Sequence, residues 1–203
     1  MRVFLTNIVI RKYSFNAYDL HNILWTLFSE KLPDKIAGMN MYCPFQYRAT
    51  LALDGALHIY MTSDIQPDIS ALDTDIGEVT STVEKPFSFI EGKSYNFILR
   101  ANPTKTNKTT GKMVPVHAKD LGNWLKRKLA GAAEIENLQY EILPAVRFVK
   151  EGVPGTVHAV HFMGTLCVTD ANRIEQIVFK GIGREKFLGF GLMTLTRVNS
   201  LIN

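Results

Sequence analysis

Tyr18 and His21 are spaced so that their side chains can act together on one substrate atom. They lie three residues apart in a segment whose apolar residues recur at helical spacing, and residues three apart on a helix share a face. An imidazole titrates near neutral pH and can therefore transfer a proton to or from a reacting hydroxyl group. The alternative is that both are rim residues, with apolar bodies against the protein and polar tips in water.

Other patterns of catalytic residues are missing from the sequence. It contains no Gly-x-Ser-x-Gly and no His-Glu-x-x-His motif, and its 2 cysteines, Cys43 and Cys167, are far apart. His158 and His161 would point to opposite faces of a strand, so they make a poor pair of metal ligands. We therefore expect no metal and no cofactor, and the few cysteines favour a reducing, cytoplasmic location.

The segment 181–191 is rich in glycine and joins an expected helix to an expected strand. This order is the reverse of a dinucleotide-binding loop, which excludes a Rossmann reading. Glycines such as Gly183 allow the backbone to approach a phosphate closely, and Arg184 and Lys186 supply positive charge. The segment therefore predicts a phosphate cradle. A helix C-cap is the alternative, but it explains only Gly181.

Charge is distributed unevenly along the chain. Residues 1–97 carry 8 Lys and Arg against 11 Asp and Glu, whereas residues 98–203 carry 15 against 8. Between Arg100 and Lys128 there are 8 basic residues and a single acid, Asp120. This local field is strong enough to recruit a polyanion such as nucleic acid, although a solvated basic face would look the same in the sequence.

The periodicity of the first half predicts the elements that position Tyr18 and His21. Asn16 is expected to cap their helix, with Asp19 three residues on. The predicted order is a strand over 1–10, the helix over 17–29, strands over 45–53 and 56–62 joined by a two-residue Asp54-Gly55 turn, a short helix over 67–75 and a strand over 78–83. The first apolar run is too short to span a membrane, so no membrane association is expected.

The second half repeats this order. It predicts a strand over 94–101, a helix over 118–133, β-rich runs over 139–150 and 156–169, a helix that begins after Asp170 and ends at Gly181, and a strand over 192–198. Two β-α-β-β-α-β units predict an α+β protein of tandem ferredoxin-like domains with antiparallel sheets. We expect an N-terminal domain over 1–90 that carries the candidate catalytic helix, and a basic C-terminal domain over 91–203.

Four motifs, in this order, resemble a known family. They are Tyr18-Asp19-Leu20-His21, the segment 100–105 (Arg-Ala-Asn-Pro-Thr-Lys), the segment 124–129 (Trp-Leu-Lys-Arg-Lys-Leu) and the glycine-rich loop through Leu192. Together they are similar to the CasE family of CRISPR repeat RNA endoribonucleases, within the repeat-associated mysterious protein superfamily. The RANPxK string and the GxGxxKxxGxGL loop are the most specific pieces, and the resemblance runs from the first strand to the last.

The resemblance implies an activity and partners. Members of this family bind the stem-loop of a CRISPR repeat, cut at its 3′ base without metal, and stay with the mature guide RNA among the other subunits of an antiviral surveillance complex. Carried over to this sequence, the catalytic histidine is His21 and its companion is Tyr18. A third, basic group belongs to the hairpin over 147–155, where Lys150 or Arg147 fills the role. The expected product is a 2′,3′-cyclic phosphate.

The same reading assigns a set of residues to RNA binding. They are basic residues of the second half and one glycine of the loop: Arg100, Lys105, Lys126, Arg127, Lys128, Arg147, Gly183, Arg184 and Lys186. Two other functions remain open at this point. One is a non-catalytic RNA-binding subunit of a CRISPR ribonucleoprotein complex. The other is a ferredoxin-like regulatory protein for a small ligand, against which the basic second half argues.

Overall fold

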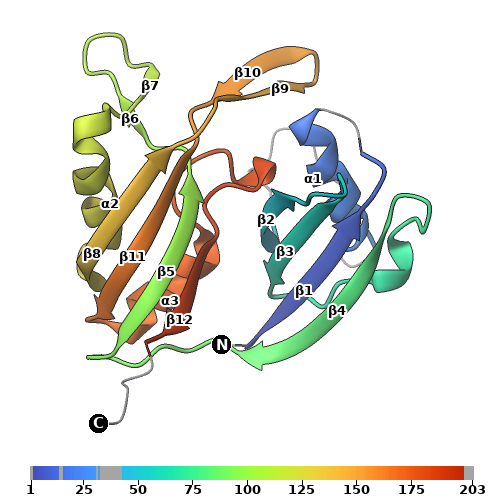
Figure 1. Cartoon of the computed structure of the whole chain (residues 1–203), viewed down its shortest axis with the longest axis horizontal. Helices are drawn as coiled ribbons and strands as arrows, with labels where there is room; N and C mark the ends of the chain where they lie inside the picture. The colour runs from blue at the N-terminus through green and yellow to red at the C-terminus, as the bar shows by residue number, and fades with distance from the viewer. Residues whose placement is uncertain (1, 14–15, 31, 33–42, 199–203) are drawn as a thin grey trace. The chain divides into compact units, whose positions relative to one another are not determined.

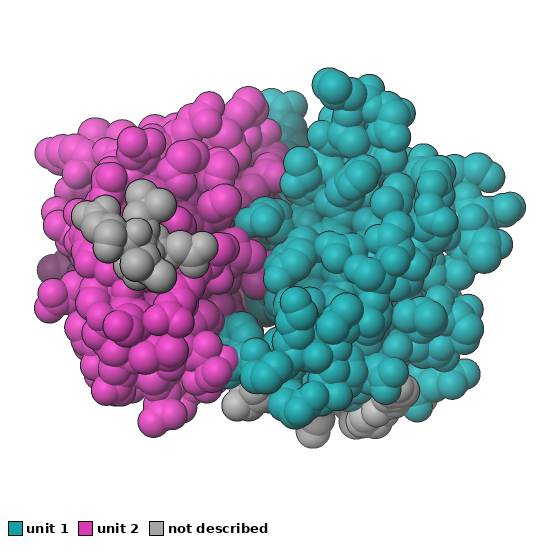
Figure 2. Space-filling model, turned by 60° about the horizontal axis from the view of Figure 1, so that its bottom comes forward, with its two compact units in different colours: residues 1–87, 147–155, 187–189 teal, residues 88–146, 156–186, 190–203 magenta. Residues whose placement is uncertain are grey.

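Two four-stranded antiparallel sheets carry the fold, one in each of two units (Figure 1). The computed structural model describes residues 2–13, 16–30, 32 and 43–198. The first unit contains residues 1–87 together with 147–155 and 187–189, and the second contains residues 88–146, 156–186 and 190–203 (Figure 2). Two short segments from the second half of the chain therefore belong to the first unit. Among the described residues, no helix is long and apolar enough to cross a membrane.

The first unit is a ferredoxin-like motif with a reduced second helix. Its elements are β1 (Arg2–Ile10), α1 (Ala17–Thr26), β2 (Phe45–Leu51), β3 (Leu57–Ser63), the 3₁₀ turn η1 (Ile69–Ala71) and β4 (Gly77–Pro86). The strand order is β2-β3-β1-β4, and all neighbouring pairs are antiparallel. Helix α1 and its C-cap Leu27 bury Leu20, Leu24 and Leu27 in one core with Ile8 and Ile59 of the sheet. The ring of His21 lies beside that of Phe45, so the N-terminal half of α1 lies beside β2.

Two local predictions for this unit are wrong in detail. The turn between β2 and β3 contains more than the two residues Asp54 and Gly55. The Ala52 amide donates to the Ala56 carbonyl at 2.8 Å across the base of the turn, and Gly55 has a φ of 84°. The expected helix over 67–75 is only the turn η1, which Asp68 caps. That segment buries only Pro67 and Leu72, and Ile69 is exposed, so no apolar helical stripe stabilises a longer helix.

The second half of the chain repeats the motif with two insertions, and residues 147–155 and 187–189 within it belong to the first unit. The elements of this half are β5 (Ser94–Ala101), β6 (Thr104–Thr106), β7 (Met113–Pro115), η2 (Ala118–Asp120), α2 (Leu121–Leu129), β8 (Ala133–Ile142), β9 (Val146–Lys150), β10 (Val153–Val157), β11 (Val160–Val168), α3 (Ala171–Lys180), η3 (Lys186–Leu188) and β12 (Met193–Arg197). The main sheet has the order β12-β5-β11-β8, and α2 and α3 cover one of its faces (Figure 1). The pairs β6–β7 and β9–β10 form separate two-stranded hairpins.

The expected boundaries shift at three places. Helix α2 ends at Leu129 rather than at residue 133, because Gly131 has a φ of 72° and turns the chain into β8. Each of the two expected β-rich runs divides into two strands, with the hairpin β9–β10 between β8 and β11. Asp170 caps α3 as predicted, accepting from the Arg173 amide at 2.9 Å. The α+β class and the tandem ferredoxin-like arrangement are confirmed.

Candidate functional site

Tyr18 and His21 lie one turn apart at the beginning of α1. Asn16 caps the helix as predicted, and its side-chain oxygen accepts from the Tyr18 amide at 3.4 Å. The two aromatic rings are stacked, with centroids 6.0 Å apart and an interplanar angle of 25°. The first turn of α1 therefore presents a phenol and an imidazole side by side.

His21 is more deeply buried than a rim residue would be. Its exposed fraction is only 8%, because three aromatic rings from different segments surround it. Their centroids lie 5.6 Å (Phe45), 5.8 Å (Trp25) and 6.1 Å (Phe187) from that of the imidazole. An imidazole shielded in this way keeps one orientation, which suits a group that must transfer a proton at a defined position.

Lys150 joins this pair from the end of β9. Its ammonium nitrogen lies 5.6 Å from the centroid of the Tyr18 ring and 5.0 Å from that of Phe187. Both distances are within the range of cation–π contacts. Side chains alternate along a strand, so Arg147 faces the opposite side of β9 from Lys150, and it is exposed. Of the two basic candidates in this hairpin, the structure brings Lys150 to Tyr18.

The hairpin that carries Lys150 has a tight two-residue turn. Glu151 and Gly152 both have positive φ, 52° and 79°, as a type I′ turn requires. Phe148 lies across the partner strand at Gly155, where an added Cβ would come within 2.3 Å of its ring. Phe148 also meets Phe187 edge to face, with centroids 5.8 Å apart. The hairpin thus packs its aromatic side and Lys150 against the same ring.

Phe187 is the residue of this cluster that the sequence analysis missed. Besides Phe148 and Lys150, its ring contacts both Tyr18 and His21. Its backbone carbonyl accepts a hydrogen bond of 2.8 Å from the hydroxyl of Tyr47 on β2, and burial raises the pKa of Tyr47 well above its usual value. In the sequence, Phe187 is one of two apolar residues between Lys186 and Gly189, which does not reveal its contacts.

Three of the residues predicted to bind RNA line one basic pocket in the second unit. They are Lys128, Gly183 and Lys186, and Lys180 at the end of α3 joins them as a further cation that the sequence analysis did not single out. The pocket has a volume of about 360 Å³. Lys186 donates to the carbonyl of Lys180 at 2.6 Å, so one of its three ammonium protons stabilises the end of α3.

The backbone conformation of the loop accounts for its four glycines. Gly181, Gly183, Gly189 and Gly191 all have positive φ, between 74° and 96°. An added Cβ at Gly189 would lie 2.8 Å from the Tyr47 ring, and one at Gly191 would lie 2.9 Å from a backbone carbonyl. The glycine content therefore follows from the path of the loop, and the case for phosphate binding depends on the lysines of the pocket.

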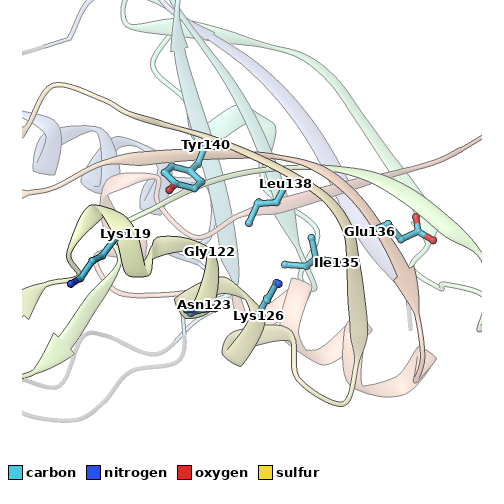
Figure 3. A pocket seen from close by; sticks show the side chains of 8 residues that line it. All are labelled: Lys119, Gly122, Asn123, Lys126, Ile135, Glu136, Leu138 and Tyr140. Atoms are coloured by element: carbon cyan, nitrogen blue, oxygen red, sulfur yellow. The ribbon is translucent and has the colours of Figure 1, made fainter.

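Lys126 lies in a different hollow from Lys128. It lines a groove of about 300 Å³ between α2 and β8, together with Lys119, Asn123 and Tyr140 (Figure 3). Positions two apart on a helix are about 200° apart around its axis, so the two lysines leave α2 on different sides. The run Lys126-Arg127-Lys128 therefore divides between two surfaces and does not form one track.

The remaining predicted contacts are dispersed over the second unit and the hairpin. The Arg100 guanidinium lies 5.0 Å from the Phe190 ring centroid, and burial lowers the pKa of Arg100. Lys105 on β6 approaches Asp120 at 4.0 Å. Arg127, Arg147 and Arg184 are exposed. Across the described part of the chain, no three His, Cys, Asp or Glu side chains group as metal ligands would.

Comparison with known proteins identifies the family. The family model described as CRISPR associated protein matches residues 4–197. The chain is 30% identical to "CRISPR system Cascade subunit CasE" of Escherichia coli (strain K12), over 95% of this chain and 98% of that protein. It is 32% identical to "CRISPR-associated endoribonuclease Cse3" of Thermus thermophilus, over 64% of this chain and 68% of that protein.

A solved structure agrees with these sequence matches. The Thermus thermophilus Cse3 structure "bound to an RNA representing a pre-cleavage complex" superposes with a TM-score of 0.79 at 27% identity, covering 97% of this chain and 100% of the other. The fold, the order of motifs and the sequence relatives thus agree over nearly the whole chain. This protein is therefore a member of the CasE family of CRISPR associated proteins.

Proposed function

We propose that this protein is an endoribonuclease that binds the stem-loop of a CRISPR repeat in precursor RNA and cuts it to release guide RNA. The observation that carries the proposal is the cluster of Tyr18, His21 and Lys150 around Phe187, all within the first unit. A relative that covers nearly all of this chain is named a Cascade subunit, and another is named an endoribonuclease. We infer that the protein stays with its product RNA among other subunits of a surveillance complex.

The proposed reaction needs only groups of the protein and the RNA. The 2′-oxygen bonds to the adjacent phosphorus, the bond from phosphorus to the 5′-oxygen breaks, and the proton lost by the 2′-hydroxyl is balanced by one gained at the 5′-oxygen. His21 transfers one of these protons, and Tyr18 orients the nucleophile or shares the transfer. The Lys150 ammonium stabilises the negative charge of the pentavalent phosphorane. The products are a 2′,3′-cyclic phosphate and a 5′-hydroxyl.

The basic pocket supports RNA binding by the second unit. Lys128, Lys180 and Lys186 all line one hollow, so three lysines contribute positive charge to it. Duplex RNA hides its base edges in a deep, narrow major groove and is recognised largely through phosphates and shape. We propose that a phosphate of the repeat stem occupies this pocket.

The decisive experiment is cleavage of labelled repeat RNA, from the genome that encodes the protein, in the presence of EDTA. We expect cleavage at one position with a 2′,3′-cyclic phosphate end. A single 2′-deoxynucleotide on the 5′ side of the cut should abolish the reaction, because it removes the nucleophile. Activity that EDTA destroys and Mg²⁺ restores would contradict the mechanism. RNA that is bound but left intact would identify a non-catalytic RNA-binding subunit instead.

A further inference from the structure

We propose that Asn16 is a positioning residue that holds the β9–β10 hairpin so that Lys150 lies beside Tyr18. The inference rests on the proposed function and adds a residue to it. Asn16 ends the segment before α1, whereas the hairpin comes from the second half of the chain. Its side chain is bonded to both, and it therefore connects the element that carries Tyr18 and His21 to the element that carries Lys150.

The amide of Asn16 uses its full hydrogen-bonding capacity. Its oxygen accepts from the Tyr18 amide at 3.4 Å and from the Val149 amide at 3.0 Å. Its nitrogen donates to the Val149 carbonyl at 3.0 Å and to the Asp19 carboxylate at 3.2 Å. An amide side chain offers two lone pairs and two protons, so all four are occupied. Helix capping alone requires only the bond to Tyr18.

The two bonds to Val149 resemble the pairing of one residue on a neighbouring strand. They fix both backbone groups of the residue that precedes Lys150. Phe148 and Lys150 share one face of β9, since side chains alternate along a strand, and both contact Phe187. Fixing the backbone at Val149 therefore sets the position at which both side chains meet the cluster.

The hairpin needs such an anchor because it is short. Strands β9 and β10 form a sheet of their own, and an isolated two-stranded hairpin is marginally stable in water.

Asp19 fixes the orientation of the Asn16 side-chain amide. Its carboxylate can only accept, so the Asn16 nitrogen must face it, and this leaves the oxygen toward the amides of Tyr18 and Val149.

Two substitutions separate positioning from capping. Asn16→Ser keeps an N-cap oxygen but is too short to pair with Val149. Asn16→Asp keeps an acceptor for both amides but cannot donate to the Val149 carbonyl or to the Asp19 carboxylate. We expect both variants to retain a capped α1 and a thermal midpoint within a few degrees of the wild type. Both should lower the single-turnover cleavage rate at saturating protein by about 10-fold, because small misplacements of a catalytic group are costly.

A double-mutant cycle with Lys150→Ala tests the route of this effect. If Asn16 acts through Lys150, then Asn16→Asp should cause no further loss of rate in the Lys150→Ala background. If Asn16 has a purely structural role, Asn16→Asp should instead lower the cleavage rate by the same factor in the wild-type and the Lys150→Ala backgrounds. Asn22→Asp is the matched control, because it adds the same charge at an exposed position of α1 and should leave the rate unchanged.

Hydrogen exchange at the Val149 amide gives a readout that does not depend on cleavage. We expect this amide to be protected in the wild type and to exchange faster in Asn16→Ser. Wild-type cleavage rates in Asn16→Asp, additive losses in the cycle, or unchanged exchange at Val149 would each overturn the inference. Failure of the wild type to cleave repeat RNA would instead overturn the proposed function, so the two failures are distinguishable.

Discussion

At the scale of single residues, the burial of His21 supports the proposed catalytic role over a surface role. A histidine on the rim of a helix would keep its ring partly in water, whereas this one lies between Phe45, Trp25 and Phe187 with 8% of its surface exposed. Burial of a polar ring among aromatic side chains costs free energy, so a structural role alone would favour an apolar residue here. Tyr18 stacks on the His21 ring and Lys150 lies against Tyr18, and these are the groups on which the proposed cleavage of a phosphodiester depends.

The first prediction concerns the proton that His21 transfers. His21→Ala should lower the single-turnover cleavage rate by about 10²-fold or more, which is the usual contribution of general acid–base catalysis, and should leave repeat affinity within a few-fold. Cleavage assays at saturating protein, with affinity measured separately on uncleavable 2′-deoxy RNA, check this. His58→Ala is the control, because His58 is an exposed histidine of the same unit. Full cleavage activity in His21→Ala would show that His21 serves only in packing.

A modified substrate then distinguishes the two proton transfers open to His21. Replacing the bridging 5′-oxygen of the scissile phosphate by sulfur gives a leaving group that departs without a proton. The His21→Ala variant should recover near wild-type cleavage of this substrate if His21 is the general acid. It should remain slow if His21 is the general base, since the 2′-hydroxyl still has to lose its proton.

At the scale of elements, one short segment closes the candidate site. Residues 187–189 belong to the first unit, and Tyr47 on β2 holds them through its hydrogen bond to the Phe187 carbonyl. Gly189 lets the backbone pass the Tyr47 ring at a distance that no other residue permits. Strand β2, the hairpin β9–β10 and this segment therefore meet α1 around one aromatic ring.

The second prediction tests this anchor. Tyr47→Phe keeps the buried ring but removes the hydroxyl, so the Phe187 carbonyl loses its donor and the stability of the protein should fall by about 1 kcal/mol. The rate of cleavage should also fall, because Phe187 loses its fixed position against His21. Tyr13→Phe is the matched control, since it also removes a hydrogen bond from a tyrosine hydroxyl to a backbone carbonyl, that of Gly55. Denaturation and single-turnover assays of both variants decide whether the loss of rate is specific to Tyr47.

At the scale of the whole molecule, the charge is concentrated where RNA binding is proposed. The second half of the sequence holds 15 of the 23 Lys and Arg residues, and the basic pocket of the second unit is built entirely from that half. Salt dependence of affinity measures such contacts, because each neutralised phosphate releases condensed counterions.

The third prediction is made for this pocket. Changing Lys128 and Lys180 together to Gln should weaken binding of the repeat stem-loop and make the slope of log affinity against log salt shallower by about one to two units. Cleavage at saturating protein should largely persist, because the pocket is proposed to hold the stem rather than the scissile phosphate. Lys85→Gln with Lys93→Gln removes the same charge from exposed lysines outside the basic half and should leave the slope unchanged. Equal slopes in the wild type, the Lys128 and Lys180 variant and the control variant would show that the RNA binds outside this pocket.

The sequence by itself determined the features that depend on neighbours along the chain. Asn16 caps α1, Tyr18 and His21 share one face of it, Asp170 caps α3, and the alternation of strands and helices predicts two ferredoxin-like units. These follow from helical and strand periods and from backbone groups only a few residues apart. The resemblance to CasE also pointed to a basic group in the hairpin over 147–155, although local pattern could not choose between Lys150 and Arg147.

Only the tertiary structure decided which distant residues meet. Phe187 against His21, the Tyr47 hydroxyl on the Phe187 carbonyl, and the pairing of Asn16 with Val149 join segments that are far apart in the sequence. No periodicity records such contacts, because they depend on how whole elements pack. The same reason explains why the run Lys126-Arg127-Lys128 looks continuous in the sequence but divides between two hollows: a helix turns by about 100° per residue, and the surfaces on either side of it come from other strands and loops.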